Sequence, residues 1–213
     1  FVMIGTAEDH HSNPLKIAIS KFKRNGGNFV SINPVRTGYS AIADEWVPIK
    51  PGTDGALFLA LIHTLIKQGL YDRDFLVQYT NAAQLVNVNK DSTEFGMFVR
   101  AEVPVEEGCF DPQNKLWWDR HANKAVVTHT PGADPFLRGE VTLPFQLLVD
   151  RVKDYTPEWA SAITGIPVET IKRLANEMGV TARDQKIELP IAWTDIWGKD
   201  HEVVTGNPVA FHA

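Results

Sequence analysis

Two short polar stretches of this chain combine residue types that can recognise a charged ligand carrying a base. One is Asn33-Pro34-Val35-Arg36-Thr37, and the other is Pro51-Gly52-Thr53-Asp54. The Arg36 guanidinium is a permanent positive charge, and the Asp54 carboxylate can accept two hydrogen bonds from the edge of a base. The alternatives are a solvated surface arginine at Arg36 and, at Asp54, a first-turn carboxylate that stabilises a helix dipole by ~0.3–1 kcal/mol.

A strand–helix–strand unit is predicted ahead of these stretches. The apolar residues 1–4 predict a buried strand that Gly5 closes, and residues 29–32 predict a second strand. Between them, Asn13 is placed to cap a helix whose first residue is Pro14, and Gly26-Gly27 ends that helix. Such a unit predicts parallel pairing of its two strands.

The two polar stretches are the first place to look for a binding site. Asn33 directly follows the second predicted strand, and Thr53 is a predicted N-cap for the long apolar helix after it. In open α/β sheets, ligands bind outside the carboxyl ends of the strands. Gly5 can likewise bring backbone N–H groups to a phosphate, although many ordinary α/β loops look the same. Its loop lacks the three glycines of the dinucleotide fingerprint.

The rest of the chain is predicted from apolar periodicity and turn residues. Helices are predicted over 53–68, 72–79, 145–152, 156–164 and 167–178, with Gly179 ending the last one. Weak periodicity and frequent Pro and Gly indicate an irregular insertion over 85–145, with a hairpin formed by residues 116–118 and 125–127. We therefore expect a core at 1–84, the insertion at 85–145, and a helical return with a turn-rich end at 146–213.

Composition excludes several classes of protein. The chain has 213 residues, 44% of them hydrophobic and 22% charged, which is typical of a globular protein. Its formal net charge of −5 gives no reason to expect a nucleic-acid surface, and no apolar run reaches the ~20 residues that span a bilayer. The single cysteine, Cys109, cannot form an internal disulfide or a four-cysteine cluster by itself. The abrupt apolar start and end are expected of an internal segment of a longer protein.

The ordered motifs of the chain resemble the molybdopterin oxidoreductases of the dimethyl-sulfoxide-reductase superfamily, in particular the formate-dehydrogenase and nitrate-reductase-like branch. The resemblance is carried by Ile4-Gly5-Thr6, His11-Ser12-Asn13-Pro14, Asn33-Pro34-Val35-Arg36-Thr37, Ala43-Asp44-Glu45-Trp46, Pro51-Gly52-Thr53-Asp54-Gly55-Ala56-Leu57, Phe75-Leu76-Val77-Gln78-Tyr79-Thr80, Thr164-Gly165-Ile166-Pro167 and Leu174-Ala175-Asn176-Glu177. Asn33 stands where the family usually has the aspartate of an Asp-Pro-Arg sequence.

This resemblance implies an α/β fold with the Rossmann-like βαβ core of a molybdopterin-guanine-dinucleotide-binding domain. It implies that the cofactor carries molybdenum or tungsten and that a 4Fe-4S cluster lies elsewhere in the full-length protein. It favours a diphosphate or pterin contact for Arg36 and a guanine contact for Asp54. The residues that it places at the cofactor are Gly5, Thr6, His11, Asn33, Pro34, Arg36, Thr37, Gly52, Thr53 and Asp54.

The function implied is the cofactor-binding segment of a molybdenum or tungsten oxidoreductase, with formate as the expected substrate and no catalytic residue in this segment. The expected partners are a small redox substrate, the remainder of the polypeptide and an electron-transfer subunit, in the cytoplasm. Two alternatives stay open: a cofactor-free structural homologue in a redox complex, and a nicotinamide-dependent dehydrogenase. The second lacks its glycine fingerprint and the acidic residue after the second strand.

Other chemistry-bearing residues are given ordinary roles. Adjacent His10 and His11 do not share a face for a metal, and Asp200-His201-Glu202 is interpreted as a solvated turn, because no second histidine lies at metal-ligand spacing. Cys109 is expected to be an inert thiol. The tryptophans at 117 and 118 are expected to pack a hairpin, and Trp193, Trp197 and His212 are not assigned to the site.

Overall fold

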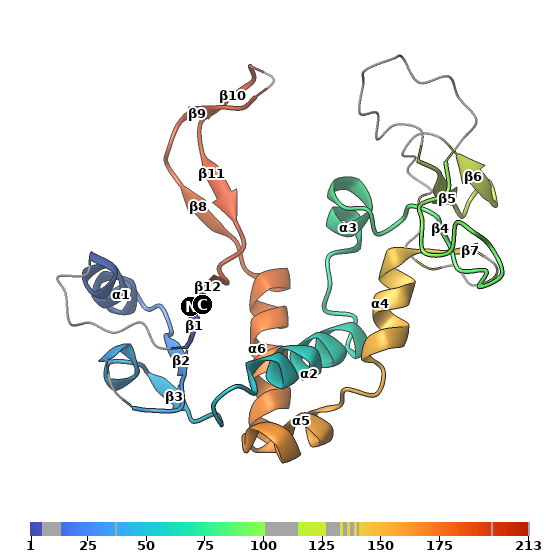
Figure 1. Cartoon of the computed structure of the whole chain (residues 1–213). Helices are drawn as coiled ribbons and strands as arrows, with labels where there is room; N and C mark the ends of the chain where they lie inside the picture. Colours follow the sequence, from blue (N-terminus) through green and yellow to red (C-terminus); the bar gives the residue numbers. More distant parts are fainter. Residues whose placement is uncertain are drawn as a thin grey trace. The chain divides into compact units, whose positions relative to one another are not determined.

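A computed structural model describes residues 1–5, 14–36, 38–100, 115–126, 133, 136, 139, 141–196 and 198–212 of the chain. The chain divides into two compact units, one formed by Phe1–Tyr71 with Asp154–Ala213 and the other by Asp72–Lys153. Figure 1 shows the course of the chain through them. Thr6, His11 and Thr37 of the predicted site, together with Asn13, Cys109 and Trp197, lie outside the described residues.

The first unit is built on a four-stranded parallel sheet with the order β12-β1-β2-β3. Its strands are β1 (Val2–Ile4), β2 (Val30–Ile32), β3 (Glu45–Val47) and β12 (Phe211–His212). Helix α1 (Pro14–Arg24) connects β1 to β2, so the predicted parallel strand–helix–strand unit is confirmed. Because β12 pairs with β1, the two ends of the chain lie side by side (Figure 1).

Side chains cover both faces of this sheet because successive residues of a strand point to opposite sides. Val2 and Ile4 join a core with helices α2 (Asp54–Lys67), α5 (Pro157–Thr164) and α6 (Val168–Asp184). Met3 joins a second core with Ile19 of α1 and Tyr39 of the 3-10 helix η1 (Gly38–Ala41). The sheet is therefore buried from both sides, and ligands can reach it only at its edges.

Helix α2 is apolar nearly all round, which predicts burial on most of its sides. In the structure only a stripe is fully buried, formed by Leu57, Ala60, Leu61 and Thr64. Phe58 on another side of the helix is 36% exposed. The stripe faces the helices α5 and α6 in the core.

Helix α6 corrects one prediction, because Gly179 does not end it. The helix continues to Asp184, and Gly179 is buried within it. A Cβ built at Gly179 would lie 2.7 Å from Leu65 Cδ2 and 2.8 Å from Leu70 Cβ. The glycine is thus required by the close approach of α6 to the end of α2, a tertiary contact that leaves no local sign in the sequence.

We predict that Gly179→Ala destabilises the protein although alanine is a better helix former than glycine. Overpacking at this contact costs about 1–3 kcal/mol, which outweighs a helix-propensity gain of up to ~1 kcal/mol. Urea unfolding measures the difference. Gly55→Ala in the first turn of α2, where an added Cβ meets nothing within 4 Å, is the control and should be neutral or stabilising. A stabilised Gly179→Ala would contradict the proposed packing.

Residues 187–206 form antiparallel ribbons that the absence of a clear period did not reveal. Strand β8 (Ile187–Leu189) pairs with β11 (Val204–Gly206), and β9 (Trp193–Thr194) pairs with β10 (Asp200–His201). Several large apolar side chains of this segment are at least 43% exposed: Ile187, Leu189, Ile191, Trp193 and Ile196.

The second unit contains two helices and short antiparallel strands. Helix α3 (Arg73–Tyr79) begins after Asp72, whose carboxylate accepts a hydrogen bond from the Phe75 backbone N–H at 2.9 Å. Strand β4 (Val86–Asn87) pairs with β7 (Val141–Thr142), which precedes α4 (Pro144–Val152). Strands β5 (Trp117–Asp119) and β6 (Lys124–Val126) form the predicted hairpin.

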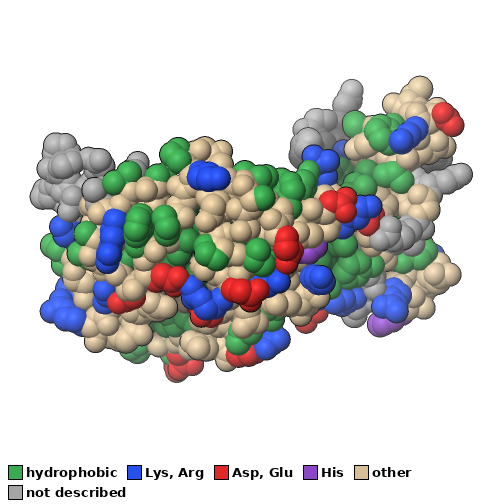
Figure 2. Space-filling model, turned by 90° about the horizontal axis from the view of Figure 1, so that it is seen from below, with side chains coloured by type: hydrophobic (Ala, Val, Ile, Leu, Met, Phe, Trp, Pro, Cys, Tyr) green, Lys and Arg blue, Asp and Glu red, His purple; other side chains and the backbone are tan. Residues whose placement is uncertain are grey.

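Charge is mixed on the face that Figure 2 displays, where acidic and basic side chains are interspersed among apolar ones. None of the helices in the described part of the chain is long and apolar enough to cross a membrane.

Candidate functional site

Three loops meet at the carboxyl edge of the parallel sheet. Gly5 follows β1, residues 33–36 follow β2, and residues 50–54 follow β3 and open α2. Because β1, β2 and β3 are parallel neighbours, their carboxyl ends lie along one edge. The fold therefore places all the described residues of the predicted site at this edge.

Asn33 ties the ends of the three strands together. Its side-chain Nδ2 donates to the Gly5 carbonyl oxygen at 3.0 Å, and its Oδ1 accepts from the Val35 backbone N–H at 3.1 Å. Its backbone N–H donates to the Val47 carbonyl at 3.1 Å. With only 4% of its surface exposed, Asn33 is a structural link within the site. Its predicted contact with a ligand stays a prediction.

Trp46 links Arg36 to this network. The Trp46 indole N–H donates to the Asn33 carbonyl oxygen at 2.9 Å, and the Arg36 guanidinium carbon lies 5.9 Å from the centroid of a Trp46 ring. A cation at that distance is attracted to the ring face. Arg36 is exposed and pairs with no carboxylate among the described residues, so its charge is available to an anion.

Trp46 was not predicted as a site residue, although the Ala43-Asp44-Glu45-Trp46 stretch that carried the resemblance contained it. Its neighbours fix the strand that bears it. The Asp44 carboxylate accepts from the Phe29 backbone N–H at 2.8 Å and pairs with the Lys23 ammonium at 2.9 Å. Partial desolvation opposes ionisation of the Asp44 carboxyl, but these bonds outweigh it and lower the pKa of Asp44 below its usual value. Glu45 pairs with Arg173 of α6.

The turn before α2 is held by the Lys50 carbonyl oxygen. This oxygen accepts from the Thr53 backbone N–H at 3.3 Å and from the Thr53 hydroxyl at 2.7 Å, across a turn in which Gly52 has a φ of 75°. Gly52 at the third position of the turn supplies this positive φ without a Cβ clash. Thr53 precedes the helix as predicted, but its hydroxyl points back to Lys50 and makes no capping bond.

Asp54 begins α2 and keeps its carboxylate unengaged. It lies in the first turn of the helix, half-buried, and no described residue forms a hydrogen bond or ion pair with the carboxylate. Hydrogen bonds join Gly5, Asn33 and Trp46, and the Trp46 ring adds Arg36 to this group. The structure therefore brings the two charges, Arg36 and Asp54, to one edge without bonding them to each other.

The cluster around His201 has an internal explanation. The His201 Nε2 lies 3.0 Å from an Asp195 carboxylate oxygen, and its ring stacks on Trp193 with 4.5 Å between centroids. Asp200 accepts a hydrogen bond from the Thr194 hydroxyl at 2.7 Å. Within the described part of the chain, no group of three His, Cys, Asp or Glu side chains is arranged to hold a metal ion.

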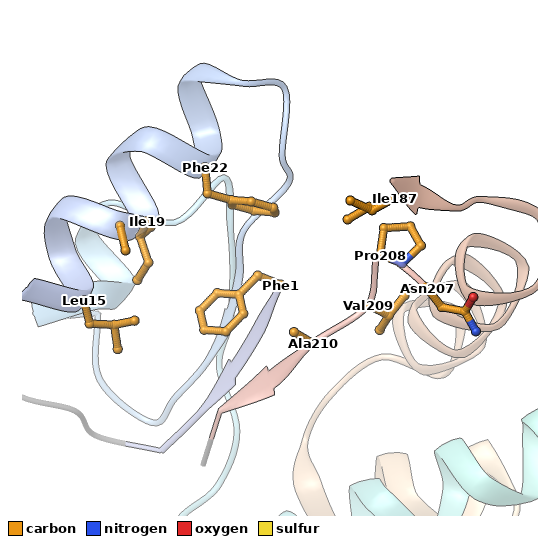
Figure 3. Close-up of a pocket in the computed structure, with 10 residues that line it drawn as sticks. Phe1, Leu15, Ile19, Phe22, Ile187, Asn207, Pro208, Val209 and Ala210 are labelled. Atoms are coloured by element: carbon orange, nitrogen blue, oxygen red, sulfur yellow. The ribbon is translucent and has the colours of Figure 1, made fainter. Parts of the chain in front are cut away.

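The cavities of the first unit lie at the opposite edge of the sheet. One of about 290 Å³ is lined by Phe1, Leu15, Phe22, Ile187 and other mostly apolar residues, which surround it in Figure 3. A second of about 710 Å³ reaches the residues just before β2. Phe1 precedes β1, so these hollows border the amino ends of the strands and are separate from the predicted site.

Comparison with known proteins defines the family. Residues 1–180 match the family model described as "Molybdopterin oxidoreductase", and the chain belongs to the molybdopterin oxidoreductase family. This confirms the resemblance found in the sequence, and the relatives in this family are oxidoreductases.

Three relatives illustrate the range of the family. One of the sulfite dehydrogenase subunits of Allochromatium vinosum is 67% identical over 100% of this chain and 23% of its own length. The alpha subunit of perchlorate reductase from Dechloromonas aromatica is 31% identical over 75% of this chain and 21% of its own length. The alpha subunit of formate dehydrogenase 2 from Nitratidesulfovibrio vulgaris is 28% identical over 91% and 18%, respectively. The chain thus spans less than a quarter of each relative.

We predict that Asn33→Asp destabilises this chain, even though the family usually has aspartate at this position. A carboxylate cannot donate to the Gly5 carbonyl, and leaving that buried bond unmade costs about 1–3 kcal/mol. Burial raises the pKa of the new carboxyl, so the deficit is present above that pKa and shrinks as protonation restores a donor at lower pH.

Urea unfolding at pH 7 and at pH 4 measures this effect. Asn176→Asp on the exposed side of α6 introduces the same charge without breaking a strand link and serves as the control. Equal stability of the Asn33→Asp variant and the parent at pH 7 would show that the amide does not hold the strand ends together.

Proposed function

We propose that the carboxyl edge of this sheet holds the dinucleotide part of a molybdopterin guanine dinucleotide in a molybdenum- or tungsten-dependent oxidoreductase. The observation that carries the proposal is the pair of unengaged charges, Arg36 and Asp54, at one edge of a parallel sheet in a chain of this family. Arg36 would bind the diphosphate through its planar guanidinium, and Asp54 would accept two hydrogen bonds from guanine.

The strand order supports a Rossmann-like core as part of this proposal. From β3 to β12 the order is β3-β2-β1-β12, so the chain reverses direction of growth at β1. Nucleotides bind at such a switch point, outside the carboxyl ends of the strands. Gly5 ends β1 there with a φ of 94°, and a Cβ built on it would meet nothing within 4 Å. That open space suits the close approach of a phosphate.

Residues of this chain would bind and orient the cofactor, while the metal supplies the redox chemistry when the cofactor is bound. The Trp46 ring would hold the Arg36 guanidinium in place, and the Asn33 amide would keep the loops after β1 and β2 at a fixed separation. A 4Fe-4S cluster elsewhere in the polypeptide and an electron-transfer subunit complete the proposed enzyme. The guanine form of the cofactor and these partners are part of the proposal.

Sulfite is the substrate that the relatives favour. Identity of 67% extends over the whole chain for a sulfite dehydrogenase, against 28% for a formate dehydrogenase. Formate, expected from the sequence, is the second candidate. A cofactor-free homologue and a nicotinamide-dependent enzyme are separated from this proposal by metal and pterin analysis of the full-length protein, because only the proposed enzyme contains both.

We predict that Asp54→Asn in the full-length enzyme lowers the content of guanine dinucleotide about tenfold or more. The amide turns one of two acceptors into a donor that faces a guanine donor, and a hydrogen bond to a charged group contributes ~1.5–3 kcal/mol. Asparagine keeps the size of the side chain, so the melting temperature of the cofactor-free protein should stay nearly unchanged. Nucleotide release followed by chromatography measures the content.

Asp74→Asn is the matched control, because Asp74 is also an acidic residue in the first turn of a helix, α3. It should leave the nucleotide content at the level of the parent enzyme. If the Asp54→Asn variant also retains full guanine content, then Asp54 acts only on the helix dipole and the proposed base contact is wrong.

Arg36→Ala is predicted to lower molybdenum and pterin content together, because a diphosphate would lose its cation. Arg36→Lys should restore the content only in part, since lysine keeps the charge but loses the planar fork. Metal analysis of the purified variants measures both effects. Parental cofactor content in the alanine variant would remove Arg36 from the site.

A further inference from the structure

The Thr164-Gly165-Ile166-Pro167 stretch contributed to the resemblance but has no place in the site described so far. It ends α5, where Gly165 adopts a φ of 79° and its backbone N–H donates to the Ser161 carbonyl at 2.9 Å. Helices commonly end in this way, with a glycine in the left-handed conformation. Its contacts with the turn before α2 indicate a second role.

Thr164 contacts the turn that presents Asp54. The Thr164 carbonyl oxygen accepts a hydrogen bond from the Lys50 backbone N–H at 3.0 Å. The Lys50 carbonyl oxygen in turn accepts from both the backbone N–H and the hydroxyl of Thr53. The Thr53 carbonyl then accepts the first hydrogen bond of α2, from the Ala56 N–H at 3.0 Å. A continuous chain of bonds thus runs from the end of α5 to the residue before Asp54.

The Thr164 side chain fixes the start of this chain of bonds. Its hydroxyl donates to the Ala160 carbonyl at 2.8 Å and accepts from the Ile166 backbone N–H at 3.1 Å. Thr164 is 1% exposed, and Ile166 is fully buried in the core with α2 and α6. Because water cannot replace these bonds in a buried position, the hydroxyl sets the orientation of the Thr164 carbonyl toward Lys50.

We propose that Thr164 is a positioning residue for the base-binding turn, acting through Lys50 and Thr53 on the place of the Asp54 carboxylate. The inference rests on the proposed role of this turn in binding guanine. A displaced turn weakens the contact with the base but leaves the pterin contacts elsewhere in the enzyme intact. The effect of Thr164 is therefore on discrimination, that is, on the preference for the cofactor with its guanine nucleotide over molybdopterin without a nucleotide.

The test is reconstitution of the cofactor-free, full-length enzyme with each of these two cofactor forms. Thr164→Val keeps the shape of the side chain and removes both hydroxyl bonds. We expect the ratio of affinities, guanine form over nucleotide-free form, to fall about tenfold, which corresponds to the loss of one good hydrogen bond to the base. Thr164→Ser retains the hydroxyl and should restore most of the ratio.

Thr64→Val is the matched control. Thr64 is also buried, at 5% exposure, and its hydroxyl donates to the carbonyl four residues earlier, Ala60, at 2.7 Å. It lies near the far end of α2 from the turn, so its loss should lower the melting temperature without changing the ratio. An unchanged ratio in Thr164→Val, or an equal fall in both affinities, overturns the proposal.

Gly165→Ala tests the same connection if Thr164→Val does not fold. A Cβ at Gly165 would lie 3.4 Å from the Lys50 side chain in a left-handed conformation that strains alanine. Gly26→Ala has a similar φ of 86° with nothing within 4 Å of the added Cβ, and provides equal strain away from the turn. A fall in the ratio for Gly165→Ala alone supports the proposal, and equal ratios in the two variants overturn it.

Asp54→Asn in the same assay separates the two levels of the proposal. A normal ratio in that variant means that the turn does not bind guanine, and the proposed function of the site fails. A low ratio in Asp54→Asn with a normal ratio in Thr164→Val leaves the site in place and rejects only the role of Thr164.

Discussion

Strands of three residues cannot hold their own ends, and the site depends on how this chain solves that problem. Each strand of the parallel sheet contributes few ladder hydrogen bonds, so the loops that follow need additional links. The Asn33 side chain supplies one by donating to the Gly5 carbonyl, and the Trp46 indole supplies another by donating to the Asn33 carbonyl. These two bonds bring the loops after β1, β2 and β3 into one arrangement.

The two charges of the site are supported in different ways. Arg36 is exposed and rests against the Trp46 ring, so its position depends on the network at the strand ends. Asp54 depends on a turn whose backbone is held by Lys50 and, through it, by the end of α5. A ligand that bridges the two would bind a surface assembled from both faces of the sheet, with α1 packing on one and α2 and α5 on the other.

Local sequence was sufficient for most elements of the fold. Apolar runs bounded by Gly and Pro predicted β1, β2, α1, α3, α4 and α5, because the residues that start and stop these elements act within a turn or two. The hairpin of β5 and β6 was predicted for the same reason. The carboxyl-edge position of residues 33–36 and 52–54 also followed, since parallel strands must place their ends along one edge.

Tertiary structure alone decided the features that depend on distant partners. Gly179 continues a helix because Leu65 and Leu70 approach it, and Thr53 turns its hydroxyl to Lys50 and leaves the helix uncapped. Strand β12 is too short to carry a period and forms only by pairing with β1. The partner of the Asn33 amide is 28 residues away in the sequence. The sequence determined which residue types stand at the site, and packing between distant segments decided which of them remain free to meet a ligand.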